Sequence, residues 1–253
     1  EKVHVAYSGV DTDGNPTGMA LVWTTAAGET PPIVQYGLTP ENLSFSAEGT
    51  SIRYLETVHH RATLDELLPG TRFYYRCGHP SAEDAEEDRR ESDVPRDDGD
   101  RTTFKQHRHS PDLDVTITGD SATRGNEREG RWSGVSSFVT APSTRRWAGD
   151  GPWDRPVSVA VVGDWGLVNA GTTFERLHQL VEDDEIDFVL HLGDIAYADD
   201  AFLERPWAFG YEEKWDAFMR RVSHDFASKV PYMVVPGNHE AECHSPACLF
   251  SAR

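Results

Sequence analysis

The sequence is short of cysteine, of long apolar runs and of positive charge, and each shortage narrows the classes of protein that it can encode. Only 24 Lys and Arg residues stand against 43 Asp and Glu, which gives a formal net charge of −19. This balance argues against a nucleic acid partner, because a phosphate backbone needs a basic surface. No apolar stretch approaches the length of a membrane span. We therefore expect neither nucleic acid nor a membrane as a partner.

The three cysteines are an odd number, so they cannot all pair within the chain. Cys243 and Cys248 are close enough in sequence for a local disulfide, which leaves Cys77 over; the alternative is a set of buried free thiols. No signal peptide is visible at Glu1, as in a secreted chain that has lost its signal or in a cytosolic one. The Asn-x-Ser sequon at Asn42 favours secretion.

Residues 1 to about 140 have the pattern of a β-sandwich, with short apolar strands separated by Pro and Gly. The turn signal Leu68–Thr71 predicts that the two strands on either side of it form a pair. The predicted strands are Met19–Thr24, Ile33–Tyr36, Val58–Leu64, Phe73–Cys77 and Val135–Thr140.

A strongly acidic segment interrupts this region. Ser81–Asp100 holds ten Asp and Glu residues, three Arg residues and no aromatic residue, so it cannot bury enough surface to order itself. We expect an exposed, mobile insertion that can be deleted with little effect; the alternative is an acidic docking or ion-binding loop. His107 and His109, which follow it, are expected to be solvated.

A linker rich in Trp, Pro and Gly, Arg145–Pro156, precedes a β-α-β-α-β pattern. Thr172–Glu175 fits a capping box at the start of the first helix. Apolar residues recur at helical spacing in both helices and are expected to pack in the core. These are Phe174, Leu177 and Val181 in the first helix, and Tyr211, Trp215, Phe218, Val222 and Phe226 in the second. His178, His191 and His224 are expected to be structural or exposed.

Three strands of this region end in residues that can bind metal. Val157–Val162 leads to Asp164, Asp187–Leu192 leads to Asp194 and Tyr197, and Tyr232–Val235 leads to Asn238 and His239. Parallel strands in an open α/β sheet bring their carboxyl ends to one edge, where sites are built. Oxygen donors with one imidazole suit ferric iron, manganese or magnesium, with tolerance for zinc.

These strand ends carry the blocks GDxG, GDxxY and GNH[DE], at residues 163–166, 193–197 and 237–240. At these blocks the chain resembles the metallophosphoesterase superfamily, and within it the purple acid phosphatases. Relatives with a DxH block fit less well, since Gly166 stands where their His would be. The run LLPGTRFYYRCG is similar to part of the fibronectin type III-like domain of the large plant and fungal members, although Phe73 occupies a position where such domains often have Tyr.

The resemblance implies a fold of class β plus α/β. We expect a fibronectin III-like β-sandwich over residues 1–144, with an acidic insertion at about 79–132. A linker at 145–156 leads to the first half of a metallophosphoesterase α/β sandwich at 157–253.

The resemblance also implies roles for the residues at the strand ends. Asp194 would bridge two metals, Asp164 and Tyr197 would bind the first, and Asn238 the second; His239 would act in catalysis, contacting phosphate or passing a proton. The cofactors would be Fe(III) and a second divalent metal, Zn, Fe or Mn, which activate water and hold the phosphoryl oxygens.

The expected function is acid phosphatase activity on phosphate monoesters, in a secreted or vacuolar protein. Alternatives are a phytate- or diester-directed metallophosphoesterase, and a non-catalytic binding module with a vestigial metal site. Three further histidines that the family supplies have no match in this sequence. We expect a second polypeptide that carries them with the remaining strands, in an enzyme nicked after Arg253; a shortened chain is the alternative.

Overall fold

The computed structural model describes residues 2–10, 16–26, 32–79, 131–142, 156–168, 170–200 and 210–241. Two compact units divide the chain, one formed by Glu1–His79 with Trp132–Arg253 and the other by Pro80–Arg131. Residues 80–130 of the acidic insertion, residues 145–155 of the linker, Cys243 and Cys248 lie outside the described residues. The predictions made for them, His107 and His109 included, remain predictions. No helix among the described residues is both long enough and apolar enough to cross a membrane.

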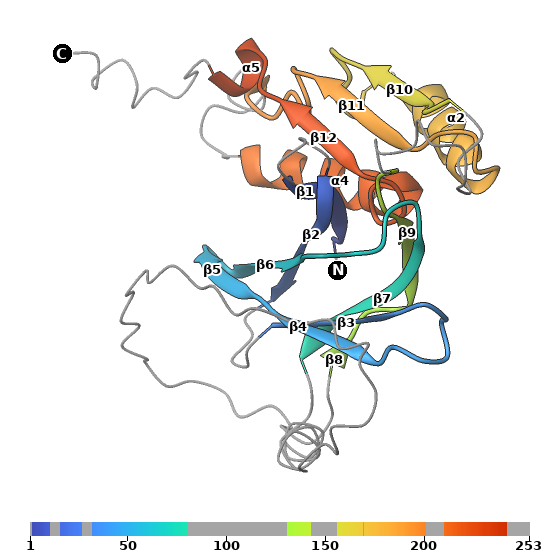
Figure 1. The fold of residues 1–253 in the computed structure, drawn as a ribbon. Coiled ribbons are helices and arrows are strands. Elements are labelled where there is room, and N and C mark those ends of the chain that lie inside the picture. Colours follow the sequence, from blue (N-terminus) through green and yellow to red (C-terminus); the bar gives the residue numbers. More distant parts are fainter. Residues whose placement is uncertain are drawn as a thin grey trace, which may run out of the picture. The chain divides into compact units, whose positions relative to one another are not determined.

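The N-terminal part of the first unit is a sandwich of two antiparallel sheets (Figure 1). One sheet has the order β1-β2-β6-β5 and the other β4-β3-β7-β8, with β9 also paired to β7. The bounds are β1 His4–Val10, β2 Pro16–Ala26, β3 Ile33–Gly37, β4 Phe45–Glu48, β5 Thr50–Tyr54, β6 Thr57–Leu64, β7 Arg72–His79, β8 Arg131–Trp132 and β9 Ser136–Val139.

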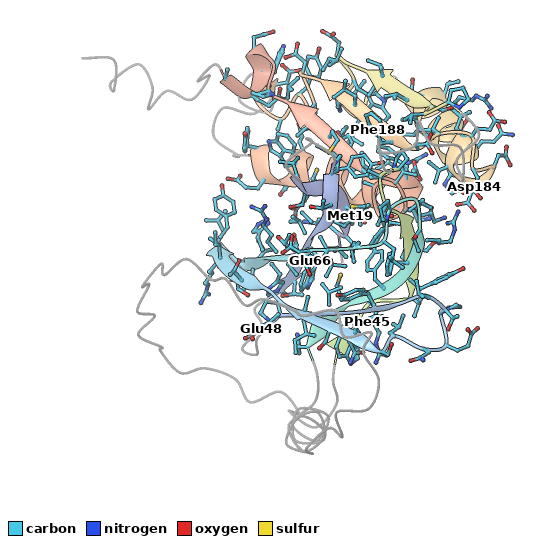
Figure 2. All side chains as sticks on the ribbon, viewed as in Figure 1. Met19, Phe45, Glu48, Glu66, Asp184 and Phe188 are labelled. Carbon is cyan, nitrogen blue, oxygen red and sulfur yellow. The ribbon has the colours of Figure 1, made fainter. Side chains whose placement is uncertain are left out.

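Alternate residues of these strands face inward and form one core. Trp23, Tyr75 and Phe138 are among its largest fully buried side chains. Figure 2 labels Met19, which lies on β2 and is fully buried in the same core. Cys77 lies fully buried in this core.

The predicted pairing of β6 with β7 is wrong. β6 pairs with β2 and β5, whereas β7 pairs with β3 and β9. The turn between them is bonded to other segments, since Leu67 N–H donates to the Thr17 carbonyl and Gly70 N–H to that of Ala141. The turn signal is therefore real, but the turn carries the chain from one sheet to the other instead of closing a hairpin.

The C-terminal part has the predicted β-α-β-α-β order around a three-stranded parallel sheet, β10-β11-β12. The strands lie side by side in Figure 1, and α5 follows the end of β12. The bounds are β10 Val159–Val162, α2 Gly171–Glu182, β11 Phe188–Leu192, α4 Tyr211–Val222, η2 Ser223–Ala227, β12 Tyr232–Val235 and α5 Asn238–Ala241.

The predicted apolar stripes of the two helices are confirmed as core. Phe174, Leu177 and Val181 of α2 are buried, as are Phe218 and Val222 of α4. They pack with Phe226 and with one face of the sheet, while Tyr211 and Trp215 are partly buried against them.

The capping box predicted at Thr172–Glu175 is wrong. Helix α2 already begins at Gly171, its N-cap is Ala170, and no side chain caps it. Ala170 is buried in the core beside Trp165 and Phe174. The start of α2 is therefore packed against apolar residues and has no hydroxyl cap.

The π-helix η2 joins the sandwich to the parallel-sheet region. Ser223 Oγ accepts a hydrogen bond from Val3 N–H at 2.8 Å and donates one to the Val3 carbonyl at 2.9 Å. Just after η2, the Ser228 carbonyl accepts bonds from the Tyr75 and Ser136 hydroxyls. Phe188, labelled in Figure 2, also lies 5.8 Å from the Tyr7 ring, measured between centroids. These contacts hold η2, the residue that follows it and the start of β11 against the N-terminal segment and strands β1, β7 and β9 of the sandwich.

Candidate metal centre

The three predicted sites of metal binding follow β10, β11 and β12 in three short loops. Asp164, Asp194 and Tyr197 have φ values of +51°, +51° and +49°. Non-glycine residues seldom adopt this left-handed conformation, which costs on the order of 1 kcal/mol or more and persists only where the surroundings enforce it. Backbone strain therefore lies on three residues that the sequence pattern predicts to be metal ligands.

The loops after β10 and β11 are held together by their backbones. Asp164 N–H donates to the Gly193 carbonyl at 3.3 Å, Trp165 N–H to that of Asp194 at 3.1 Å, and Gly166 N–H to that of Ile195 at 3.0 Å. Consecutive bonds of this kind extend the pairing of the two strands beyond the sheet. The distance between Asp164 and Asp194 is thus fixed by main-chain bonds.

The loops after β11 and β12 touch at two glycines. A Cβ added to Gly193 would lie 2.7 Å from Cα of Gly237, and one added to Gly237 would lie 2.2 Å from Oδ1 of Asp194. Real Cβ atoms do not approach other atoms so closely. Gly193, with φ +82°, also needs a conformation that suits glycine. Both glycines are therefore required for the approach of one loop to the other.

The structure brings four of the five predicted residues into direct contact. The Tyr197 hydroxyl lies 3.4 Å from Oδ1 of Asp164, and His239 N–H donates to Oδ1 of Asp194 at 3.1 Å. The Tyr197 and His239 ring centroids are 4.2 Å apart. Asn238, the fifth, is exposed and immediately precedes His239 at the start of α5.

Negative charge accumulates at this edge of the sheet. Burial, followed by the charges of Asp164 and Asp194, raises the pKa of the Tyr197 phenol. Neither aspartate forms an ion pair with another described residue. A cation placed here would offset the charge of the carboxylates and favour the phenolate. The donor set, with two carboxylates, a phenol and an amide, therefore fits hard metal ions.

Sequence reasoning missed Asp199. Nδ1 of His239 lies 3.0 and 2.8 Å from the two carboxylate oxygens of this buried residue. Burial alone would lower the pKa of His239, but the bond to Asp199 and the charges of Asp199, Asp194 and Asp200 outweigh it and raise that pKa. Asp199, Asp200 and His239 offer three ligand atoms within 4.8 Å of one another. The pair Asp199 and Asp200, separated from Tyr197 by Ala198, was the sequence signal that could have indicated these further acidic groups.

His191 illustrates a histidine that has no place among the candidate ligands. Its side chain is fully buried in β11, and Nδ1 lies 2.7 Å from the Tyr232 hydroxyl. Burial lowers its pKa, so the ring is kept neutral. The structural role predicted for it is confirmed.

Comparison with known proteins agrees with this geometry. Residues 1–93 match the family model described as the purple acid phosphatase N-terminal domain, and residues 157–251 match the calcineurin-like phosphoesterase model. Human acid phosphatase type 7 is 28% identical over 95% of this chain, and purple acid phosphatase 15 of Arabidopsis thaliana is 26% identical over 87%.

The chain therefore matches these two domain models in order, and it is similar to curated purple acid phosphatases. It spans 40% and 35% of the length of these two relatives. A purple acid phosphatase from yellow lupin seeds superimposes with a TM-score of 0.57 at 21% identity, covering 95% of this chain and 35% of that one. The predicted fold, a β-sandwich followed by a metallophosphoesterase region, is thereby confirmed.

Proposed function

We propose that this chain contributes to an acid phosphatase that hydrolyses phosphate monoesters at a two-metal centre. The observation that carries the proposal is the gathering of Asp164, Asp194, Tyr197 and His239 at one edge of the sheet, with Asn238 beside them. Acid phosphatases are among the relatives of this chain, and substrate class and metal number are our proposals.

In this proposal Asp164 and Tyr197 would hold Fe(III), Asp194 would serve both metals, and Asn238 would bind the second metal, Zn, Fe or Mn. Two metal ions would hold the phosphoryl oxygens and lower the pKa of a bound water. His239, oriented by Asp199 through Nδ1, presents its other ring nitrogen for a hydrogen bond to the substrate. Its raised pKa favours the protonated ring, which can donate that bond or a proton to the leaving oxygen.

One face of the parallel sheet is apolar and largely uncovered in the described residues. Ala160, Val162, Val189 and Tyr232 pack toward the helices, so their alternate neighbours face the other way. Parallel sheets are normally buried on both faces. The most exposed of the outward-facing residues, at 39–56% of their accessible surface, are Val159, Val161, Leu192 and Val235.

We propose that a further layer of strands covers this face and brings the three histidines that the resemblance implies. The ligands assigned above give the first metal three protein ligands and the second two, counting Asp194 for both, whereas a hard cation takes about six. A second polypeptide is the source that we propose. Exposed Asn42 is available for glycosylation, in keeping with the proposed secretion of the protein.

The test combines metal content, intact mass and turnover of the purified protein. We expect iron with a second metal, a charge-transfer band in the visible spectrum, and faster hydrolysis of p-nitrophenyl phosphate than of bis(p-nitrophenyl) phosphate or inositol hexakisphosphate. Denaturing mass spectrometry, with and without reductant, shows whether a second polypeptide is present. A protein with little metal and no turnover would support the binding module instead, and a preference for the diester or inositol phosphate would replace the proposed substrate class.

Replacement of Tyr197 by Phe tests its assignment as the iron ligand. We expect the visible band to disappear while the fold remains, because the phenolate oxygen is the source of the charge transfer. Tyr74→Phe, a change in the sandwich, is the matched control and should leave the spectrum unaltered. A coloured wild type whose band persists in Tyr197→Phe would show that Tyr197 is not a ligand.

A further inference from the structure

Glu240 connects two loops of the site through a single carboxylate. Oε2 accepts hydrogen bonds from Asp194 N–H and Gly237 N–H, both at 2.9 Å, and Oε1 accepts one from Ile195 N–H at 2.8 Å. Two of these donors belong to the loop after β11 and one to the loop after β12. The side chain is half-buried, and three N–H donors satisfy most of the acceptor capacity of the carboxylate.

The two junctions between the three loops are built differently. Three consecutive backbone bonds, at Asp164, Trp165 and Gly166, hold the loop after β10 to the loop after β11, and the Tyr197 hydroxyl adds a side-chain contact to Asp164. No main-chain to main-chain hydrogen bond between described residues joins the loop after β11 to the loop after β12. At this second junction the hydrogen bonds run through three carboxylates, those of Glu240, Asp194 and Asp199.

Asn238 lies between two residues whose N–H groups form hydrogen bonds at the second junction. Gly237, which precedes it, donates its N–H to Glu240. His239, which follows it, donates its N–H to Oδ1 of Asp194. Both neighbours of Asn238 are thus tied to the loop that carries Asp194. Glu240 accepts three of the hydrogen bonds involved, and the others join His239 to Asp194 and to Asp199.

We propose that Glu240 is a positioning residue that sets the place of Asn238 relative to Asp194, and so governs the affinity of the second metal selectively. This inference rests on the proposed function. Asp164 and Asp194 are held together by the backbone bonds of the first junction, and Tyr197 contacts Asp164. The half of the site that would bind the first metal is therefore joined by contacts in which Glu240 takes no part.

Glu240→Gln tests the proposal with minimal change of shape. The amide keeps one acceptor oxygen, but its NH₂ group faces backbone donors and cannot accept their hydrogen bonds. Loss of a supporting contact of this kind weakens metal affinity by roughly 10–100-fold. In protein loaded with Fe(III) and Zn(II), we expect the zinc Kd to rise by that factor, while the iron content and the visible band per iron stay as in wild type.

Amide hydrogen exchange in the metal-free protein provides a readout that does not depend on activity. Exchange at Asp194, Ile195 and Gly237 should accelerate in Glu240→Gln, whereas exchange at Trp165 and Gly166 should not. Glu213→Gln is the matched control, because Glu213 is exposed on α4 and its loss removes the same charge. Glu240→Asp, whose carboxylate is one methylene shorter, serves as the second variant if the glutamine variant does not fold.

The outcomes separate this inference from the proposed function. A wild type with two metals whose Glu240→Gln variant keeps both, or loses both equally, overturns the selective role of Glu240 and leaves the phosphatase proposal standing. A wild type that binds neither metal overturns the proposed function. Unchanged exchange at the three amides refutes the link between the loops whatever the metal content.

Discussion

His60 in the β-sandwich and His239 beside the parallel sheet show how differently the two regions use one residue type. His60 is buried, with its ring nitrogens 2.8 Å from the hydroxyls of Thr25 and Ser51, and burial lowers its pKa, as do His79 and His59. His239 is half-buried against the Asp199 carboxylate, and its pKa is raised. Neutral partners hold the first ring uncharged, whereas carboxylates keep the second one available to protonate or bind an anion.

The backbones of the two regions differ in the same way. In the sandwich, the described non-glycine residues with positive φ are Leu55 and Glu66, both in connections between strands. Beside the parallel sheet, Asp164, Asp194 and Tyr197 have positive φ. In the sandwich, backbone strain therefore lies in the connections between strands. In the sheet region, most of it lies on residues of the candidate metal site. The sandwich can be expected to govern stability, and the loops of the sheet to govern activity.

The largest expected effect comes from Asp194→Ala. If Asp194 bridges two metals as proposed, its loss should release both, so turnover should fall on the order of 10³-fold or more, beyond the loss of a single transition-state donor. Elemental analysis should show less than one metal per molecule, while circular dichroism remains that of the folded protein. Retention of two metals after this change would refute the bridging role.

A smaller effect is expected at acid pH, where the wild-type protein should lose about 3 kcal/mol of its free energy of unfolding because of His4. Burial, with a minor contribution from the charge of Lys2, outweighs a main-chain bond to Met219 and lowers the pKa of His4 to about 4 from an ordinary value of 6.5. Between these pH values the unfolded chain binds the proton and the folded chain does not, so stability contributed by neutral His4 above pH 6.5 is lost as the pH falls toward 4.

Urea unfolding of wild type and His4→Gln at several pH values measures this contribution. The wild-type free energy of unfolding should decrease more steeply than that of the variant between pH 6.5 and 4. His59→Gln, a change at an exposed position of β6, should keep the wild-type slope. Parallel slopes in all three proteins would contradict the assignment to His4.

The smallest expected effects come from two glycines, Gly237 beside the parallel sheet and Gly18 in the sandwich, and they compare the two regions directly. A Cβ at Gly237 would lie 2.4 Å from Asp194 N, and one at Gly18 would lie 2.4 Å from the Leu64 carbonyl oxygen. Gly237→Ala should displace the loop of Asn238 and lower turnover by roughly 10²-fold. Gly18→Ala should lower the free energy of unfolding by about 1–3 kcal/mol through overpacking. Equal losses of kcat per folded molecule in the two variants would show that the regions do not divide stability and activity as proposed.

The sequence by itself determined the parallel strands, the apolar faces of α2 and α4, and the polar residues at the ends of the strands. Each is a local pattern, because side-chain period and turn residues act over a few positions. It also placed Asp164, Asp194, Tyr197 and His239 at one edge, since parallel strands share a direction.

Only the tertiary structure decided which sheet each sandwich strand joins, how α2 begins, and what Asp199 and Glu240 contact. β6 and β7 are neighbours in sequence, yet their partners come from different sheets. Asp199 reaches His239 across 40 positions, and Glu240 reaches Asp194 across 46. Such contacts depend on loops whose backbones are brought together by packing elsewhere in the chain, so no local pattern of residue types encodes them.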